Sequence, residues 1–398
     1  MPNVPCDSAG VADRFIPFAP PFIGEEEKQE VLDTLESGWL TTGPRTQRFE
    51  HELAEFCGAR YAVAVNSCTA ALHLALAALG VGEGDEVITS PFTFASTAHV
   101  ILYQRARPVF VDIEPDTFNL DPAKVASSIT SRTRAILPVH YGGHPAEMDP
   151  ILSLARRHGL AVVEDAAHAL GARYRERPVG SMGDVTCFSF YATKNLTTGE
   201  GGMLVTGHEE VARRARMLGM YGIDDAREIW RRYTPRGTWE YDIIALGYKY
   251  NMMDIQAALG LHQLRRLDWF TKRRAENAAI YAEILGGVAE VTLPRARPWV
   301  SHAWHLFPLL LNLERLRVSR EQVIECLRAA GVGTSVLFRP LHLHSYYREV
   351  LGLGEGAFPV AEDVFVRLVN LPVSPKIAPE EIRLVSEAIL RILKEGHR

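Results

Sequence analysis

Short runs of β-branched and apolar residues alternate with segments of helical period between residues 24 and 260, and this alternation constrains the fold most strongly. A strand, a helix and a second, parallel strand form a βαβ unit, so its repetition predicts an α/β fold around a mainly parallel sheet. We therefore expect a seven-stranded sheet flanked by helices. The predicted strands are residues 61–65, 86–89, 108–112, 135–139, 161–164, 185–190 and 203–206.

The pattern changes after about residue 265, which predicts a division of the chain. We expect an N-terminal tail at 1–23, a large domain at 24–265 and a smaller α+β C-terminal domain at 266–398. One continuous helix is predicted to lead out of the large domain over 254–274. Further predicted elements are helices at 69–79, 148–157 and 379–394 and a strand at 306–311, with Thr69 as the expected N-cap of the first helix.

Composition excludes several classes of partner. The 398 residues carry a formal net charge of −5, which leaves no basic surface for nucleic acid or acidic lipid, so we expect small-molecule substrates. No long apolar window and no leader-like pattern is evident, which predicts a cytoplasmic protein without a membrane partner. Five cysteines without a C-x-x-C pair favour reduced thiols. Residues 226–241 lack any period and predict either a long loop near a site or a plain surface excursion.

Lys194 lies in a polar, glycine-rich loop that follows the apolar strand at 185–190. Functional side chains of open α/β sheets gather beyond the carboxyl ends of the strands, and Ser189 lies at this strand end. Together the two side chains suit a Schiff base beside a bound phosphate. The alternative is a solvated loop lysine, which composition alone favours.

Asp165 and His168 follow the next predicted strand, at 161–164. A buried carboxylate can hold the protonated ring nitrogen of pyridoxal phosphate and keep it cationic, which makes the ring an electron sink. On the same turn, His168 can hydrogen-bond the cofactor's phenolic oxygen or Asp165. The alternatives are a helix N-cap for the aspartate and a structural role for the histidine.

Thr69 and Ala70 open a helix directly after a strand, so their backbone N–H groups can face a phosphate. Helix capping without any ligand is the alternative. Phe94 follows another strand, and its ring can lie flat against a planar cofactor or pack in the core.

Several other patterns point to different sites. His140 and His144 have metal-ligand spacing, but the intervening Tyr-Gly-Gly is not helical and no third ligand is evident, so we expect no metal. Residues 80–84 resemble a nucleotide loop but precede a strand instead of following one. Asp254 and Glu200 are candidate paired carboxylates, although nothing in the sequence makes them neighbours.

In this order, these elements resemble the DegT/DnrJ/EryC1/StrS family of sugar aminotransferases, which are fold-type I pyridoxal phosphate enzymes. The resemblance extends to residues 38–44, 138–142, 333–335 and 342–344. It implies that Lys194 is the Schiff-base lysine, Asp165 the partner of the pyridinium nitrogen and His168 the residue beside the phenolic oxygen.

The resemblance also implies a phosphate site and a dimer. Ser189, Thr69 and Ala70 look like the phosphate cup, and Phe94 occupies the position of an aromatic ring stacked on the cofactor. The segment around Asn251 resembles one that the neighbouring subunit donates, so that Asn251 would reach the other protomer's phosphate. A homodimer with two shared active sites is thereby implied.

The same resemblance restricts the range of expected substrates. Residues 197–202 are similar to members that aminate C4 of nucleotide-linked 4-keto sugars. His168 is similar to the subgroup that makes 4-amino-4-deoxy-arabinose on UDP, although Phe94 stands where that subgroup is expected to have tryptophan. Lys249, Arg339 and His342 are candidates to meet the sugar's diphosphate.

The implied reaction is a transamination. An amino acid, glutamate in our interpretation, would pass its amino group through an internal aldimine at Lys194 and a pyridoxamine phosphate intermediate, with the freed lysine as base. Alternatives are an aminotransferase acting on a cyclitol or a C3 keto-sugar and a non-catalytic regulator that binds pyridoxal phosphate.

Overall fold

The computed structural model describes residues 15–224 and 240–397. Most of the segment at 226–241, for which the sequence predicts a loop near a site, lies outside the described residues, as does most of the predicted N-terminal tail. Ile16, within that predicted tail, is buried and exchanges backbone hydrogen bonds with Gly331 and Gly333.

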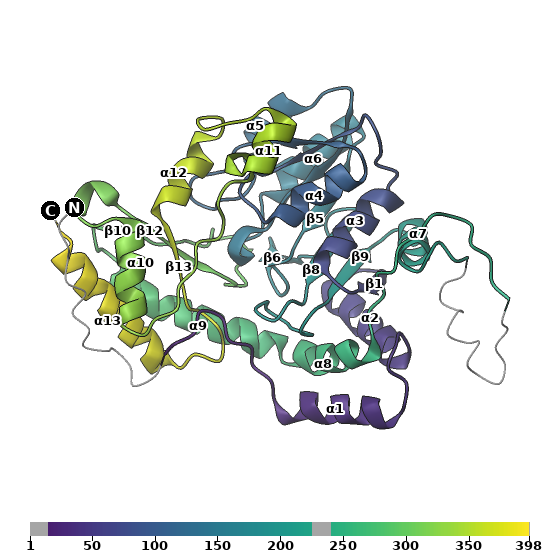
Figure 1. The fold of residues 1–398 in the computed structure, drawn as a ribbon, viewed down its shortest axis with the longest axis horizontal. Coiled ribbons are helices and arrows are strands. Elements are labelled where there is room, and N and C mark those ends of the chain that lie inside the picture. The colour runs from purple at the N-terminus through teal and green to yellow at the C-terminus, as the bar shows by residue number, and fades with distance from the viewer. Residues whose placement is uncertain (1–14, 225–239, 398) are drawn as a thin grey trace.

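A seven-stranded sheet forms the centre of the larger part of the molecule (Figure 1), with the strand order β1-β9-β8-β5-β4-β2-β3. Six strands are parallel, and β9 runs antiparallel to both of its neighbours. The strands are β1 (Tyr61–Val65), β2 (Glu86–Thr89), β3 (Arg107–Phe110), β4 (Thr133–Leu137), β5 (Ala161–Asp165), β8 (Val185–Ser189) and β9 (Gly202–Thr206). Each overlaps a predicted strand, and the α/β fold class is confirmed.

Helices cover both faces of this sheet because side chains alternate along each strand. Val63 and Val163 point into a cluster with α3, α4 and α7, whereas Ala62 points into a second cluster with α2 and α8. Val162 joins a third cluster with α5 and α6. These helices are α1 (Glu25–Glu36), α2 (Pro44–Cys57), α3 (Cys68–Ala78), α4 (Ala95–Tyr103), α5 (Pro122–Ser128), α6 (Met148–His158), α7 (Glu209–Gly219) and α8 (Asp254–Arg265).

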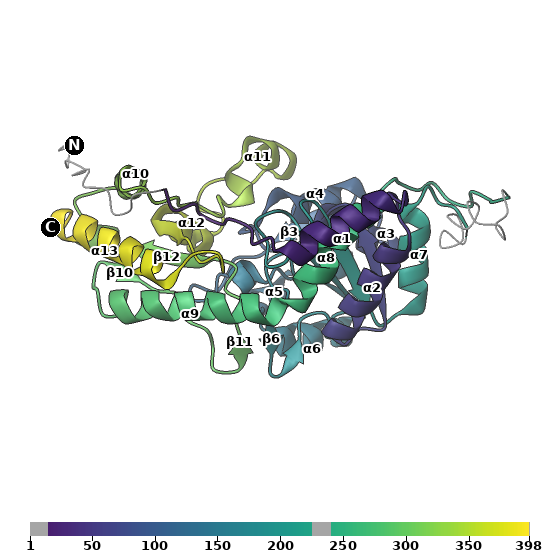
Figure 2. The ribbon, with the colours of Figure 1, turned by 90° about the horizontal axis from the view of Figure 1, so that it is seen from below.

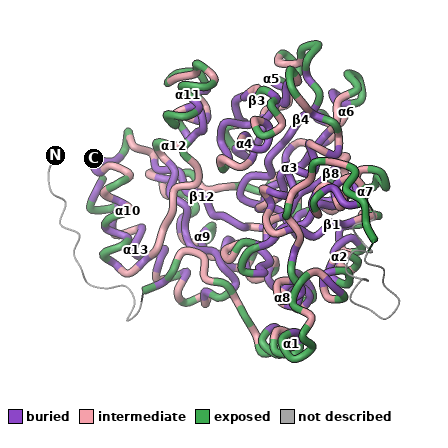
Figure 3. Tube along the Cα trace, turned by 45° about the vertical axis from the view of Figure 1, so that its right-hand side comes forward, coloured by how far each residue is buried: buried purple, intermediate pink, exposed green. Residues whose placement is uncertain are grey.

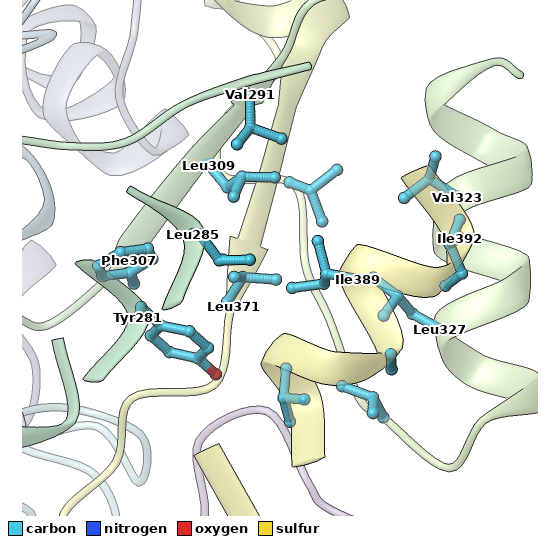
Figure 4. Close-up of a cluster of buried hydrophobic side chains, with 14 of the residues drawn as sticks. Tyr281, Leu285, Val291, Phe307, Leu309, Val323, Leu327, Leu371, Ile389 and Ile392 are labelled. Atoms are coloured by element: carbon cyan, nitrogen blue, oxygen red, sulfur yellow. The ribbon is translucent and has the colours of Figure 1, made fainter. Parts of the chain in front are cut away.

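The C-terminal part has its own apolar core, shown in Figure 4, in which Tyr281 and Phe307 face the helical residues Leu327 and Ile389. Its three-stranded sheet has the order β10-β12-β13. The elements are α9 (Leu267–Leu285), β10 (Val291–Thr292), β12 (Phe307–Leu311), α10 (Arg320–Ala329), α11 (Ser345–Leu351), α12 (Pro359–Arg367), β13 (Leu368–Leu371) and α13 (Pro379–Glu395).

Short elements complete the fold. A second three-stranded sheet, of order β11-β6-β7, consists of β6 (Arg173–Tyr174), β7 (Arg177–Pro178) and β11 (Val300–Ser301). The described residues also form the 3-10 turns η1 (Tyr141–Gly143), η3 (Leu313–Arg315) and η4 (Leu341–Leu343). In Figure 3 the outer faces of α1 and α13 are exposed, while the strands at the centre are buried.

Two sequence predictions are wrong in detail. The single helix at 254–274 is two helices, because Arg266 separates α8, which packs on α1 and α2, from α9, which packs on α13 (Figure 2). Ser67, not Thr69, caps α3 through a hydrogen bond from the Ala70 N–H. Cys57, Cys68 and Cys187 are free, as the sequence predicts.

The division of the chain at residue 265 stays a prediction. One apolar cluster joins Phe92 and Phe110 to Phe358 and Val364, so buried contacts cross the expected boundary. Within residues 15–224 and 240–397, none of the helices combines the length and apolarity needed to cross a bilayer.

Candidate active site

The predicted site residues come from neighbouring strands. Asp165 is the last residue of β5, and Ser189 is the last residue of β8. The two strands are parallel neighbours in which Asp165 pairs with Cys187, so their carboxyl ends meet at one edge of the sheet. Lys194 follows β8 in the adjoining loop, and its positive charge affects the pKa of Asp165. The structure thus brings Lys194 and Asp165 together.

The Asp165 carboxylate is buried and forms no ion pair within residues 15–224 and 240–397, although the charge of Lys194 acts on it. It is 4% exposed, and it accepts hydrogen bonds from Thr97 Oγ1 at 2.7 Å and from the Ala167 N–H at 3.2 Å. Burial raises the pKa of Asp165, while these two bonds and the charge of Lys194 oppose the rise. No helix begins at Asp165, so the alternative of a helix cap is wrong. A buried carboxylate is stabilised by a cationic hydrogen-bond donor, and a protonated ring nitrogen would supply one to Asp165.

Lys194 is partly buried in the loop after β8, where its backbone N–H donates to the Tyr191 carbonyl at 2.9 Å. Burial lowers the pKa of the Lys194 amine from 10.5 to about 8, against the opposing charge of Asp165. A substantial fraction of this amine is therefore neutral in mildly alkaline solution, and only the neutral form is nucleophilic. The alternative interpretation of Lys194 as a solvated loop lysine therefore does not apply to this side chain.

His168 is fixed in one neutral tautomer. Its Nδ1 accepts a hydrogen bond from the Gly142 N–H at 3.3 Å, which leaves the proton on Nε2. Burial lowers the pKa of His168 well below its ordinary value, and the charge of Lys194 lowers it further. His168 is therefore a neutral hydrogen-bond donor at Nε2. Its Nδ1 is occupied by Gly142 and not by Asp165.

Glu164, the acid next to Asp165, points to the opposite face of β5. Its carboxylate contacts His140 Nε2 at 2.8 Å and accepts from the Gly183 N–H at 2.7 Å and Thr186 Oγ1 at 2.8 Å. The other ring nitrogen of His140 accepts from the Ala146 N–H at 3.0 Å. These partners satisfy the hydrogen-bonding capacity of the Glu164 carboxylate inside the core, so Glu164 has a structural role. No group of metal-binding side chains occurs in the described part of the chain.

The start of α3 lies against β9. A Cβ on Gly202 would come within 2.5 Å of the Ser67 backbone, so only glycine allows this approach. Thr69 is half-buried there, and the Ala70 N–H already donates to Ser67 Oγ at 3.1 Å. Ser189 Oγ accepts from the Tyr191 N–H at 3.4 Å. The Ala70 N–H can consequently meet a phosphate only as a shared donor.

Phe94 occupies the N-cap position of α4 and is 62% exposed. Its ring centroid lies 6.1 Å from that of Phe338, at an interplanar angle of 49°. The exposure excludes simple core packing for this ring. It leaves Phe94 free to contact a ligand.

Asn251 lies beside the edge strand β1, where it forms a bridge with Val65. Its Nδ2 donates to Thr42 Oγ1 at 2.7 Å, and its Oδ1 accepts from the exposed Lys249 ammonium. Thr42 Oγ1 in turn donates to the Met252 carbonyl at 2.6 Å. Thr42 was not found from the sequence, because a threonine in a loop carries no signal of its partner.

Asp254 anchors the same segment. It is fully buried and accepts from the N–H groups of Gly43 at 2.8 Å and Thr46 at 2.9 Å, and from Thr46 Oγ1 at 2.6 Å. The carboxylate therefore accepts hydrogen bonds from backbone N–H groups at the start of α2 that have no partner within the helix. This role replaces the candidate pairing of Asp254 with Glu200.

Two candidates for the sugar's diphosphate differ in accessibility. Arg339 is exposed and donates to the Leu343 carbonyl at 3.0 Å. His342 is 0% exposed, and its Nε2 lies 2.8 Å from Glu362 Oε1. A histidine without exposed surface cannot meet a diphosphate, so the prediction for His342 is wrong.

An α/β sheet with a lysine and a buried aspartate at its carboxyl edge is the arrangement expected of a fold-type I aminotransferase, and comparison with known proteins identifies the chain as one. The model of the DegT/DnrJ/EryC1/StrS aminotransferase family matches residues 21–390. The chain belongs to this family, which confirms the resemblance seen in its sequence.

Relatives cover nearly the whole chain. It is 50% identical over 386 residues to the uncharacterized protein MJ1066 of Methanocaldococcus jannaschii, covering 97% of this chain and 100% of that protein. It is 49% identical over 383 residues to the spore coat polysaccharide biosynthesis protein SpsC of Bacillus subtilis, covering 96% and 98%.

Solved structures share the fold. Spr1654 of Streptococcus pneumoniae, assigned as a sugar aminotransferase and solved in its PMP-form, is 34% identical with a TM-score of 0.89, covering 95% of this chain and 99% of that one. DesI, solved in the presence of its TDP-sugar product, is 33% identical with a TM-score of 0.85, covering 96% and 94%.

Proposed function

We propose that this aminotransferase moves an amino group from L-glutamate to the C4 keto group of a sugar carried on a nucleotide. The observation that carries the proposal is the pair formed by Asp165 and Lys194: a buried carboxylate that forms no ion pair with a described residue, near a lysine whose pKa burial lowers to about 8. The cofactor is pyridoxal 5′-phosphate. Spr1654, a structural neighbour, has been solved in a PLP-form as well as a PMP-form.

The side chains present fit this cofactor. Asp165 needs a cationic hydrogen-bond donor, which a protonated pyridine nitrogen provides. Lys194 supplies the amine, and neutral His168 offers Nε2–H to a phenolic oxygen. When bound, the cofactor supplies an aldehyde that condenses with amines and a cationic ring that takes up the electron pair of a broken bond.

In the proposed mechanism, the neutral Lys194 amine would remove the proton from Cα of the amino donor, because its pKa of about 8 leaves part of it unprotonated and able to act as a base. Lys194 would deliver this proton to the cofactor carbon that carried the aldehyde. Asp165 would hold the proton on the ring nitrogen, His168 would bind the phenolic oxygen, and Phe94 would contact the ring. In the second half of the reaction, Lys194 would take the proton back from that carbon and deliver it to C4 of the sugar.

The phosphate is proposed to lie against Ser189, Thr69 and Ala70 at the start of α3, where the helix dipole favours an anion. Asn251 of one protomer is proposed to reach the phosphate in its partner's site, so the enzyme would be a homodimer with shared active sites. We also place the enzyme in the cytoplasm and retain 24–265 and 266–398 as its two domains.

Amination at C4 is supported by the resemblance of residues 197–202. A nucleotide-linked substrate is supported by DesI, a structural neighbour solved in the presence of its TDP-sugar product. Thr197 Oγ1 donates to the Phe190 carbonyl at 3.3 Å, and Thr198 Oγ1 donates to the Glu200 carbonyl at 2.6 Å. Both side chains are buried, so they would act on the sugar only through the shape of the loop that carries Lys194. Lys249 and Arg339 remain the proposed partners of the diphosphate.

The test is a panel of ketone acceptors with glutamate as donor, in which each amino product is identified by mass. Nucleotide-linked 4-keto sugars, including the UDP-linked precursor of 4-amino-4-deoxy-arabinose, should be aminated. Preferential amination of 3-keto sugars or of cyclitol ketones would overturn the C4 assignment while leaving the enzyme class intact. If adding glutamate leaves the absorbance of the bound cofactor unchanged, glutamate is excluded as the amino donor.

A further inference from the structure

The imidazole of His168 stacks against two other rings. The centroid of His305 is 4.4 Å from that of His168 at an interplanar angle of 30°, and Phe338 lies 5.8 Å away at 8°. Both rings come from the C-terminal part of the chain, His305 from the segment before β12 and Phe338 from the segment before η4. Together they restrict rotation of the His168 ring.

Residues 302–306, which we call the strap, bind the turn that holds His168. The Ala303 N–H donates to the Gly143 carbonyl at 3.0 Å, and the Leu306 N–H donates to the Gly142 carbonyl at 3.1 Å. The Gly142 N–H is the donor to His168 Nδ1. A Cβ on Gly143 would lie 3.0 Å from the His168 carbonyl oxygen, so the strap and the turn fit closely.

The strap also reaches the residue that follows Lys194. Asn195 is buried, and its Nδ2 donates to the Ala303 carbonyl at 3.1 Å. One short segment therefore contacts both the turn that donates to His168 and the side chain of the residue after Lys194.

His305 acts here through the face of its ring. It is buried, and its Nδ1 has no hydrogen-bond partner among the described residues. Burial lowers the pKa of His305 well below its ordinary value, so the ring is neutral and places no charge against Lys194. Phe338 is partly exposed and also contacts Phe94.

We propose that His305 and Phe338 are positioning residues that fix the plane of the His168 ring, so that its Nε2–H stays directed at the bound cofactor. The proposal rests on the proposed role of His168, but the stack itself is a property of the chain without cofactor. Neither residue needs to touch the sugar.

The experiment compares His305→Ala with His305→Phe, which keeps a flat ring without the imidazole nitrogens. The control is His302→Ala, which removes an imidazole from the same strap; His302 stacks on Trp304, with centroids 4.0 Å apart, and not on His168. The first readout is the His168 tautomer in cofactor-free protein, by ¹⁵N NMR. The second is the affinity for pyridoxal phosphate, and the third is the pH at which the bound cofactor changes absorbance.

We expect His305→Ala to weaken cofactor binding about two- to tenfold, the range expected for loss of one ring pair, and to produce a mixture of His168 tautomers. His305→Phe should restore both properties, and His302→Ala should leave them within about twofold of wild type. Phe338→Ala tests the stack from its accessible side and should shift the absorbance titration in the same direction as His305→Ala.

The proposal is overturned if His305→Phe is as defective as His305→Ala. It is also overturned if His305→Ala and Phe338→Ala both keep the wild-type His168 tautomer and the wild-type affinity for pyridoxal phosphate. If no keto-sugar is aminated but the tautomer still depends on His305, the substrate proposal fails and the positioning role stands.

Discussion

Thr97 gives the sharpest test of the role of Asp165, because it donates the shorter of the two hydrogen bonds to that carboxylate, at 2.7 Å. An ionised carboxylate only accepts, so the Thr97 hydroxyl proton points to Asp165, and Thr93 Oγ1, 2.8 Å away, must donate to Thr97. Thr97→Val removes this donor with little change of shape. Asp165 would keep only the bond from the Ala167 N–H.

The expected magnitude follows from the kind of bond that is lost. A hydrogen bond to a charged group contributes about 1.5–3 kcal/mol, which corresponds to about a 10- to 150-fold change in an equilibrium that requires the charge. Because Thr97 opposes the effect of burial, its loss raises the pKa of Asp165 further. Less of the carboxylate is then ionised to hold the ring nitrogen, so kcat and cofactor affinity should both fall by at least about tenfold.

The assay measures the affinity for pyridoxal phosphate and the rate of the half-reaction with glutamate. Thr89→Val is the matched control, because Thr89 is also buried but donates to the Leu137 carbonyl, at 2.8 Å. It should lower the free energy of unfolding without changing kcat. If Thr97→Val and Thr89→Val behave alike, Asp165 doesn't act through its charge and our reasoning is refuted.

Three further predictions concern other parts of the site. In cofactor-free protein, Lys194 should react with an amine-selective reagent with a midpoint near pH 8 instead of 10.5, the reactive fraction rising with pH; an ordinary midpoint would contradict the effect of burial. Asp254→Asn should lower the free energy of unfolding by about 2–4 kcal/mol, measured by urea denaturation, because an amide NH₂ would face the donors at the start of α2; a change within about 0.5 kcal/mol would contradict this. Mixing inactive Lys194→Ala and Asn251→Ala proteins should restore activity through hybrid dimers with one intact site, and failure to do so despite subunit exchange would exclude shared sites.

The strands were predictable because each combines β-branched residues with a turn at its end. Val63 and Ala62 show why the sheet has helices on both faces: successive side chains in a buried strand point in opposite directions, and both are apolar. The antiparallel direction of β9 is not encoded in such a pattern, since a buried strand reads the same in either direction.

Two predictions failed because their signals were ambiguous. Ser67 and Thr69 both suit an N-cap, and only the backbone conformation selects Ser67. His342 has the composition of a phosphate ligand, but Glu362 holds it in the interior. Burial of this kind depends on contacts between distant segments, which local patterns do not contain.

The partners of the site residues were harder to predict than the residues themselves. Thr97 lies on α4 and Gly142 in a turn after β4, yet they bind Asp165 and His168 respectively. Neither has a distinctive local pattern. His305 and Phe338 come from still more distant parts of the chain, so their stacking on His168 emerges only from the fold.

Transfer of an isotope tests the central claim most directly. With ¹⁵N-labelled glutamate, pyridoxal phosphate and a nucleotide-linked 4-keto sugar, the wild-type enzyme should place the label on C4 of the sugar, as mass spectrometry and NMR of the product would show. Lys194→Ala should produce none. A labelled amino sugar formed equally well by Lys194→Ala would contradict the assignment of this lysine.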